Sequence, residues 1–123
     1  MTINEAAALT GLSADTLRYY ERIGIIPRVP RLPNGRRDYD AEAMRRINLA
    51  LRLKAAGMPL KTVKRYIALD AAGEPARGER TRLLLETCEA LDEKLKNLQN
   101  SLRLARELLN EEAAPRGESC AAA

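Results

Sequence analysis

The last third of this 123-residue chain carries an apolar repeat that restricts its fold more than any other feature. Apolar residues recur from residue 84 to residue 109 at spacings of 4, 3, 4, 3, 4, 3 and 4. This heptad spacing, flanked by mixed charge, is typical of a coiled-coil seam. The seam residues are Leu84, Cys88, Leu91, Leu95, Leu98, Leu102, Ala105 and Leu109.

We expect the seam to lie on one helix over residues 79–112, about 50 Å long at ~1.5 Å per residue. A domain of about 70 residues is too small to bury so long a stripe, and the helix therefore needs a second helix as its partner. Because most oligomers are homo-oligomers with twofold symmetry, the seam predicts a homodimer.

The beginning of the chain predicts two short helices. Thr2 and Glu5 fit a capping box that opens the first helix. Gly11 gives the following turn its backbone freedom, and Ser13 is a good N-cap for a second helix that ends at Gly24. Two short helices joined by a glycine-containing turn are typical of a helix-turn-helix.

Residues 25–40, which we call the wing, predict a two-stranded ribbon. The pair Asn34 and Gly35 is the strongest short hairpin signal, and the surrounding prolines suit an edge ribbon. Arg31 would lie on one arm, with Arg36, Arg37 and Tyr39 on the other. Two more helices are expected, over residues 41–56 and from Pro59 to about residue 69. Their expected core stripes are Met44, Ile47, Leu51 and Ala55 in the former and Leu60, Val63 and Ile67 in the latter.

Positive charge gathers in the N-terminal part of the chain. Residues 1–57 hold ten Lys and Arg against six Asp and Glu, whereas residues 79–123 hold seven against nine. This asymmetry is expected of a part that meets a polyanion. Arg18 and Arg22 would point outward from the second helix with Tyr19, and the planar fork of arginine suits guanine edges and phosphates.

Composition excludes several other functions. The chain has no histidine, no Gly-rich phosphate loop and no carboxylate pair near a plausible pocket, which predicts that it is not an enzyme. It has no apolar run of about 18 residues and no charged-then-apolar opening segment. We therefore expect a cytoplasmic protein with no membrane partner, and two cysteines suit a reducing compartment.

Three stretches, "TINEAAALTGLSADTLRYYERIGIIP", "NGRRDY" and "RLKAAGMPLKTVK", resemble the N-terminal domain of the MerR family of bacterial transcriptional regulators. The resemblance covers about residues 1–112. It implies an all-α fold with a small β-wing: a winged helix-turn-helix domain followed by a long dimerisation helix that forms an antiparallel coiled coil. The implied organisation is a DNA-binding domain over 1–70, a linker over 71–78, the dimerisation helix over 79–112 and a flexible tail over 113–123.

The resemblance also implies a function. Such homodimers bind double-stranded DNA at a near-palindromic promoter operator and distort it on receiving a signal, so that RNA polymerase can engage the promoter. Thr16 joins the candidates by matching the family's recognition-helix motif, whereas Tyr20 is expected to be mostly packed. Arg36 stands where a tyrosine is commoner in the family. The candidate DNA-binding residues are Thr16, Arg18, Tyr19, Tyr20, Arg22, Arg31, Arg36, Arg37 and Tyr39.

The resemblance also raises the question of which signal such a regulator would detect. Metal-sensing members of the family resemble one another in a C-terminal loop with two cysteines, and here only Cys120 lies in that region. In an antiparallel dimer, Cys88 and Cys120 of the partner subunit could meet as a two-thiolate soft-metal site or a redox disulfide. The alternative is a packed Cys88 and an inert Cys120. No cofactor is assigned, and a soft metal ion or a thiol-reactive signal remains a hypothesis.

Two other functions share some of these motifs. A coiled-coil adaptor could use the basic head to bind an acidic or phosphorylated protein. A DNA-architectural protein would bend DNA without any effector. Sequence-specific binding with a steep salt dependence would separate a regulator from the adaptor.

Overall fold

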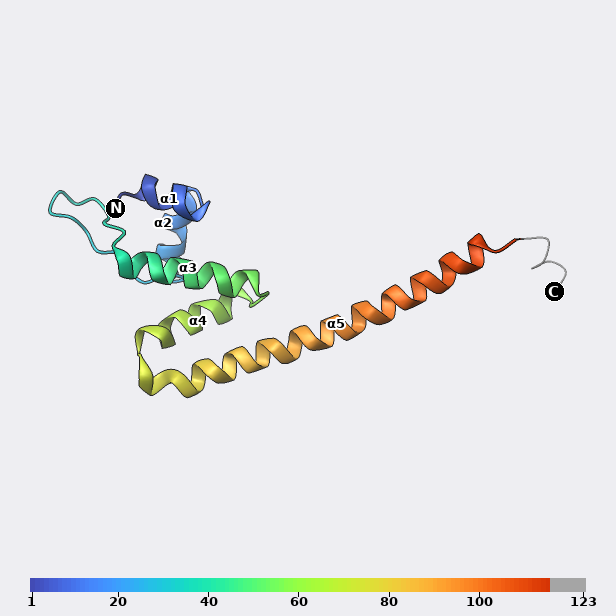
Figure 1. Cartoon of the computed structure of the whole chain (residues 1–123). Coiled ribbons are helices and arrows are strands. Elements are labelled where there is room, and N and C mark those ends of the chain that lie inside the picture. The colour runs from blue at the N-terminus through green and yellow to red at the C-terminus, as the bar shows by residue number, and fades with distance from the viewer. Residues whose placement is uncertain (116–123) are drawn as a thin grey trace. The chain divides into compact units, whose positions relative to one another are not determined.

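The computed structural model describes residues 1–115, which are mostly helical (Figure 1). The helices are α1 (Ile3–Thr10), α2 (Ala14–Ile23), α3 (Ala41–Ala55), α4 (Leu60–Ala71) and α5 (Arg77–Ala113), with a 3₁₀ turn, η1 (Glu74–Ala76), before α5. The chain forms two units, Met1–Thr87 and Cys88–Ala123, and α5 passes through the boundary. None of the helices in the described part is long and apolar enough to cross a membrane.

The signals that open and close the first two helices are confirmed. Thr2 Oγ1 accepts a hydrogen bond from the Glu5 amide at 3.2 Å, and Glu5 Oε1 accepts from the Thr2 amide at 3.4 Å. Ser13 Oγ caps α2 by accepting from the Thr16 amide at 3.0 Å. Gly24 ends α2 at φ 82°, a left-handed conformation that favours glycine. A Cβ at Gly24 would also lie 3.0 Å from Lys64 Cε.

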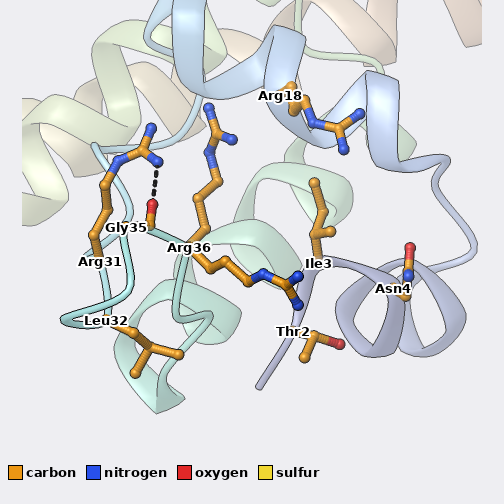
Figure 2. Close-up of a pocket in the computed structure, with 9 residues that line it drawn as sticks. Thr2, Ile3, Asn4, Arg18, Arg31, Leu32, Gly35 and Arg36 are labelled. Atoms are coloured by element: carbon orange, nitrogen blue, oxygen red, sulfur yellow. Dashed lines mark hydrogen bonds between the residues drawn. The ribbon is translucent and has the colours of Figure 1, made fainter.

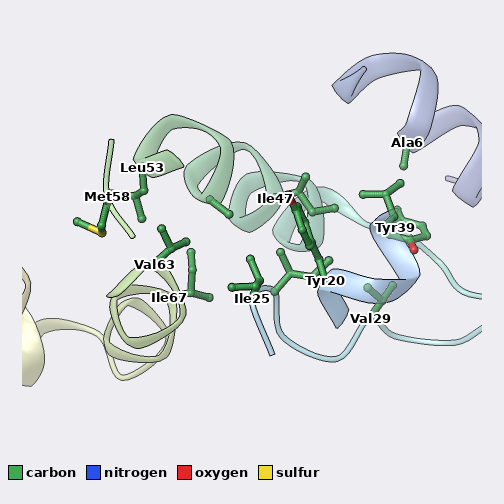
Figure 3. Packing of buried hydrophobic residues seen from close by; sticks show 13 residues of the cluster. Ala6, Tyr20, Ile25, Val29, Tyr39, Ile47, Leu53, Met58, Val63 and Ile67 are labelled. Carbon is green, nitrogen blue, oxygen red and sulfur yellow. The ribbon is translucent and has the colours of Figure 1, made fainter. Parts of the chain in front are cut away.

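Helices α1, α2, α3 and α4 share one aliphatic core that includes two buried tyrosines (Figure 3). Helix α3 packs against both α1 and α4, and α1 packs against α2. The buried residues are Ala6, Leu17, Tyr20, Ile25, Ile26, Val29, Tyr39, Ile47, Ala50, Leu53, Met58, Val63 and Ile67.

The buried face of α3 differs from the predicted stripe. Ile47 is buried as expected, and Met44 and Leu51 are half-buried against the core, but Ala50 and Leu53 are more deeply buried and Ala55 is exposed. Helix α3 packs against both α1 and α4, so residues that face either helix are buried. In α4, Leu60 is 44% exposed because it is the first residue of the helix.

The wing is closed by a single antiparallel bridge, Arg31 to Arg37, rather than by the two-stranded ribbon that we predicted. Pro30 accepts a hydrogen bond from the Asp38 amide at 2.7 Å but has no N–H to return. The Arg36 amide donates to Asn34 Oδ1 at 3.0 Å instead of to the facing arm. The turn runs over residues 32–35, closed by the Gly35 amide on the Leu32 carbonyl at 2.9 Å.

Helix α5 begins at Arg77, two residues before the predicted start, and ends at Ala113. Its buried residue is Leu83. All the seam residues are exposed on the single chain, from 38% for Leu91 to 68% for Leu98 among its leucines.

Tyr39 differs from its predicted role on the DNA-binding surface, because its side chain is 1% exposed. Its hydroxyl has no hydrogen-bond partner in the described part of the chain. Burial raises the pKa of this phenol, and the positive charge of Arg37 opposes the rise. The backbone of Tyr39 is also held, because its amide donates to the Met1 carbonyl at 2.8 Å.

We predict that Tyr39→Phe leaves the free energy of unfolding unchanged or raises it by up to about 1 kcal/mol, because the lost hydroxyl is unpaired. By contrast, Tyr20→Phe removes an acceptor of the Lys54 ammonium at 2.6 Å and should cost about 1 kcal/mol. Urea titrations of both variants and the wild type at neutral pH measure these differences. A large loss of stability in Tyr39→Phe would contradict the first expectation.

Wild type and Tyr39→Phe also test the raised pKa of the Tyr39 phenol. A phenol that ionises at a higher pH in the folded chain contributes stability that is complete below about pH 10, its unfolded pKa, and is lost as the pH rises through the folded pKa. Wild type should therefore lose more stability than Tyr39→Phe as the pH rises above about 10. Parallel pH dependences in the two proteins would contradict this.

Candidate nucleic-acid interface

The outward face of α2 carries two arginines and a tyrosine in two turns. Arg18 Nη1 lies 2.8 Å from Asp15 Oδ1, and this carboxylate is 95% exposed. The Arg22 guanidinium lies 5.5 Å from the centroid of the Tyr19 ring, which is 42% exposed. An exposed acid and a cation–π contact hold the arginines only weakly. Both guanidinium groups therefore stay available to a polyanion.

A basic groove of about 550 Å³ lies beside this face (Figure 2). Its walls are the first turn of α1, Arg18 of α2 and the wing. Arg31 Nη1 donates to the Gly35 carbonyl at 2.7 Å, which stiffens the turn and leaves the charge at the groove. Arg36 is exposed, and its guanidinium has no hydrogen bond or ion pair within residues 1–115. The lining residues are Thr2, Ile3, Asn4, Arg18, Arg31, Leu32, Gly35, Arg36 and Arg37.

Arg37 lines the groove but also has a structural partner. Its Nε donates to Glu21 Oε1 at 3.0 Å and to Oε2 at 3.3 Å, and the two side chains are 24% and 11% exposed. Glu21 Oε2 also accepts from the Val29 amide at 3.2 Å. One carboxylate of α2 thus contacts both arms of the wing, at Val29 and at Arg37.

Two predicted contact residues are engaged inside the domain. The Thr16 hydroxyl lies 2.8 Å from Ser13 Oγ, so it belongs to the N-cap of α2. Tyr20 is 8% exposed, in keeping with the expectation that it is mostly packed. Its hydroxyl is reached by Lys54 Nζ at 2.6 Å, and the same ammonium lies 5.1 Å from the ring centroid.

Sequence reasoning missed Lys54 and the role of Glu21. Lys54 comes from the end of α3, 34 residues after Tyr20, and Glu21 lies 16 residues before Arg37. No local pattern reports contacts between residues so far apart, and both residues read as ordinary surface charges in their own helices.

The structure leaves the proposed thiol site undescribed. Cys88 is an exposed free cysteine, and Cys120 lies outside the described residues. Residues 1–115 contain no group of three or more His, Cys, Asp or Glu side chains that could hold a metal ion.

Capped helices α1 and α2, an outward arginine face and an arginine-bearing wing define a DNA-binding protein of the helix-turn-helix class. The model of the MerR HTH family regulatory proteins matches residues 1–69, and the model described as "MerR, DNA binding" matches residues 44–109. The chain belongs to the MerR family of helix-turn-helix transcriptional regulators.

Individual relatives agree with this assignment. The HTH-type transcriptional regulator AdhR of Bacillus subtilis is 37% identical over 93 residues, which are 76% of this chain and 66% of AdhR. The chain thus spans just under two thirds of that relative's length. Among solved structures, a putative MerR family transcriptional regulator from Listeria monocytogenes has a TM-score of 0.79 and 34% identity, covering 98% of this chain and 93% of that one.

A further solved structure contains nucleic acid. HiNmlR, a MerR family regulator lacking the sensor domain, was crystallised bound to promoter DNA. It has a TM-score of 0.72 and 30% identity to this chain, covering 89% of this chain and 86% of HiNmlR.

We predict that Glu21→Ala lowers the free energy of unfolding by about 2–4 kcal/mol, because it leaves Arg37 and the Val29 amide without their shared acceptor. Asp15→Ala is the matched control, since it removes an exposed acid of the same helix and should cost no more than about 1 kcal/mol. Urea unfolding followed by circular dichroism measures both. Equal losses in the two variants would show that Glu21 does not anchor the wing.

Proposed function

We propose that this protein is a transcriptional regulator that binds a near-palindromic promoter operator as a homodimer and distorts the DNA in response to a signal. The observation that carries the proposal is the basic surface made by α2 and the wing, in a chain of the MerR family. Arg18 and Arg22 of α2 would enter the major groove with Tyr19, while Arg31 and Arg36 of the wing would hold the backbone alongside.

The remaining candidates take supporting positions in this proposal. Arg37 would anchor the wing and meet phosphate with whichever donors Glu21 leaves free. Tyr20 and Thr16 would hold α2 in place, and Tyr39 would pack beneath the wing. The DNA-bound structure of HiNmlR, at 30% identity, supports a promoter as the partner of this fold.

The homodimer rests on α5. Its leucine stripe is exposed along the single chain, from Leu84 at 40% to Leu109 at 65%. Contiguous apolar surface of this kind marks an interaction site. We propose that two copies of residues 79–112 pair as an antiparallel coiled coil, with the DNA-binding domain in residues 1–70, a linker over 71–78 and a tail over 113–123.

The proposal places the protein in the cytoplasm with RNA polymerase as a partner at the promoter, and gives it no enzymatic role. The adaptor alternative is disfavoured, because the relatives named above are transcriptional regulators. The architectural alternative shares every DNA-binding feature and differs only in having no effector. A soft metal ion or a thiol-reactive signal acting on Cys88 and Cys120 stays the hypothesis for that effector.

We predict that the double variant Arg18→Ala/Arg36→Ala loses about hundredfold in affinity for an operator selected from random duplexes, since each arginine contact contributes about 1–3 kcal/mol. The plot of log affinity against log salt should also become shallower, because fewer counterions are released. Fluorescence anisotropy over a series of salt concentrations measures both quantities.

The control for this test is Arg77→Ala/Arg103→Ala, which removes the same charge from exposed positions of α5. It should bind with nearly wild-type affinity. If the Arg18 and Arg36 variant bound the operator as tightly as the control, the interface would lie elsewhere.

We predict that Leu102→Lys converts the dimer to a monomer, because it places a charge in the seam. Leu104→Lys is the matched control: its side chain is 47% exposed against 49% for Leu102, but it lies off the heptad positions. Sedimentation velocity at micromolar concentration distinguishes the two. A monomer in both variants, or in neither, would argue against this seam.

A further inference from the structure

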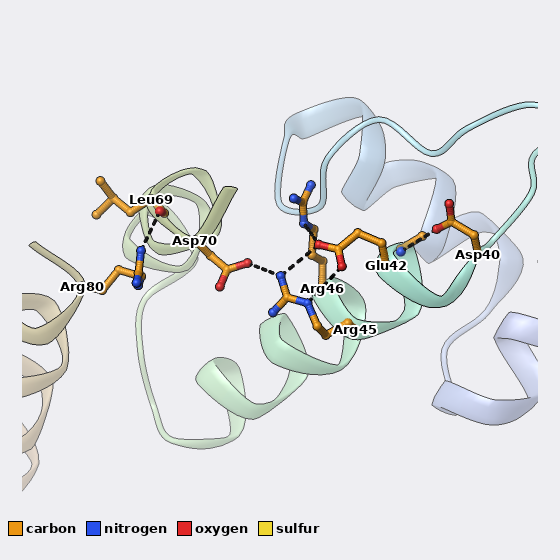
Figure 4. A network of polar contacts seen from close by, with 8 residues as sticks. Asp40, Glu42, Arg45, Arg46, Leu69, Asp70 and Arg80 are labelled. Atoms are coloured by element: carbon orange, nitrogen blue, oxygen red, sulfur yellow. Dashed lines mark hydrogen bonds and ion pairs between the residues drawn. The ribbon is translucent and has the colours of Figure 1, made fainter. Parts of the chain in front are cut away.

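Arg80 of α5 makes a hydrogen bond across the joint between α4 and α5 (Figure 4). Helix α4 ends at Ala71 and α5 begins at Arg77, with only η1 between them. From the first turn of α5, Arg80 Nη1 donates to the Leu69 carbonyl at 2.9 Å and to the Gly73 carbonyl at 2.6 Å. A single guanidinium nitrogen therefore holds the last turn of α4 and the reversal that follows it.

The chemistry of this contact makes it strong. The Leu69 carbonyl lies in the last turn of α4 and also accepts from the Ala72 amide at 3.1 Å, and carbonyls at this end of a helix carry the negative end of the helix dipole. Hydrogen bonds from a charged donor to such carbonyls are stronger than those between neutral groups. Gly73, at φ 74°, turns the chain, and its carbonyl also accepts from the Ala76 amide at 3.1 Å. Arg80 thus fixes the turn at both ends.

An ion pair near the joint also connects the end of α4 to α3. Asp70, near the end of α4, lies 2.6 Å from Arg45 of α3 and is 18% exposed (Figure 4). Leu83, one turn after Arg80, is the buried residue of α5. Arg65 and Glu79 also pair at 3.1 Å, but both are well exposed, and such pairs contribute little. Arg80 is therefore the main polar link between α4 and α5.

We infer that Arg80 is a positioning residue: it holds the start of α5 against the end of α4 inside the first unit, and this local geometry sets the spacing between the two half-sites that a homodimer reads. This inference rests on the proposed function. The geometry is sensitive, because a tilt of about 5° at the start of a helix of about 55 Å moves its far end by about 5 Å. That shift exceeds the ~3.4 Å rise of one base pair.

The test is selection from a random duplex library with the full chain, followed by affinity measurements on the selected operator with its half-sites moved apart by one base pair. Arg80→Ala should select the same half-site sequence as wild type, because the residues of α2 and the wing are unchanged. Its discrimination against the altered spacing should fall by about tenfold, as expected for the loss of charge-assisted hydrogen bonds. Arg82→Ala is the matched control, since within residues 1–115 the ion pairs of Arg82 are with Glu79 and Glu86 of its own helix.

Amide hydrogen exchange separates positioning from unfolding. In Arg80→Ala, the amides of Ala72, Gly73 and Ala76 should exchange faster, while those of α3 keep their protection. If α3 also loses protection, Arg80→Lys, which keeps the charge and a donor, replaces Arg80→Ala in the spacing test and should show an intermediate loss of discrimination.

Wild-type spacing discrimination in a folded Arg80 variant would overturn the inference and leave the proposed function standing. Loss of discrimination in Arg82→Ala to the same extent would also overturn it, because the effect would not be specific to the contacts of Arg80. If even the wild-type chain selects no paired half-sites, the proposed homodimeric operator binding fails, and the inference fails with it.

Discussion

The carboxylate of Glu21 is the contact on which the candidate interface depends. It lies on α2, and its oxygens accept from Arg37 on one arm of the wing and from the Val29 amide on the other. The wing has few backbone hydrogen bonds of its own to hold its conformation. The contacts of Glu21 add that restraint, and Arg31 and Arg36 lie beside Arg18 around one groove.

The arginines of this chain serve two purposes that composition alone cannot separate. Arg37, Arg45 and Arg80 join elements, through Glu21, Asp70 and the carbonyls that end α4 respectively. Those on the outward face of α2 and on the wing have exposed acids, a ring or a turn carbonyl as partners, or none in the described residues. The first set shapes the domain, and the second set leaves its charge for a polyanion.

Helix α5 shows a similar division along its length. Its beginning belongs to the first unit, where Leu83 is buried and Arg80 closes the joint with α4. Beyond that point its leucines are exposed, and the heptad pattern gives them a regular line. A helix that is fixed at its start and apolar along its remaining length is suited to joining two copies of a DNA-binding unit, as proposed here.

The sequence by itself determined the local features: the caps at Thr2 and Ser13, the end of α2 at Gly24, and the periodicity of α5, because each depends on residues within a few positions of one another. Tertiary structure decided the rest. The wing kept one bridge because Pro30 has no N–H to return and Asn34 captured the Arg36 amide. Tyr39 became a core residue, and Arg37 became an anchor through Glu21, 16 residues away. These outcomes depend on contacts between residues that are far apart in the sequence, and local sequence patterns do not predict such contacts.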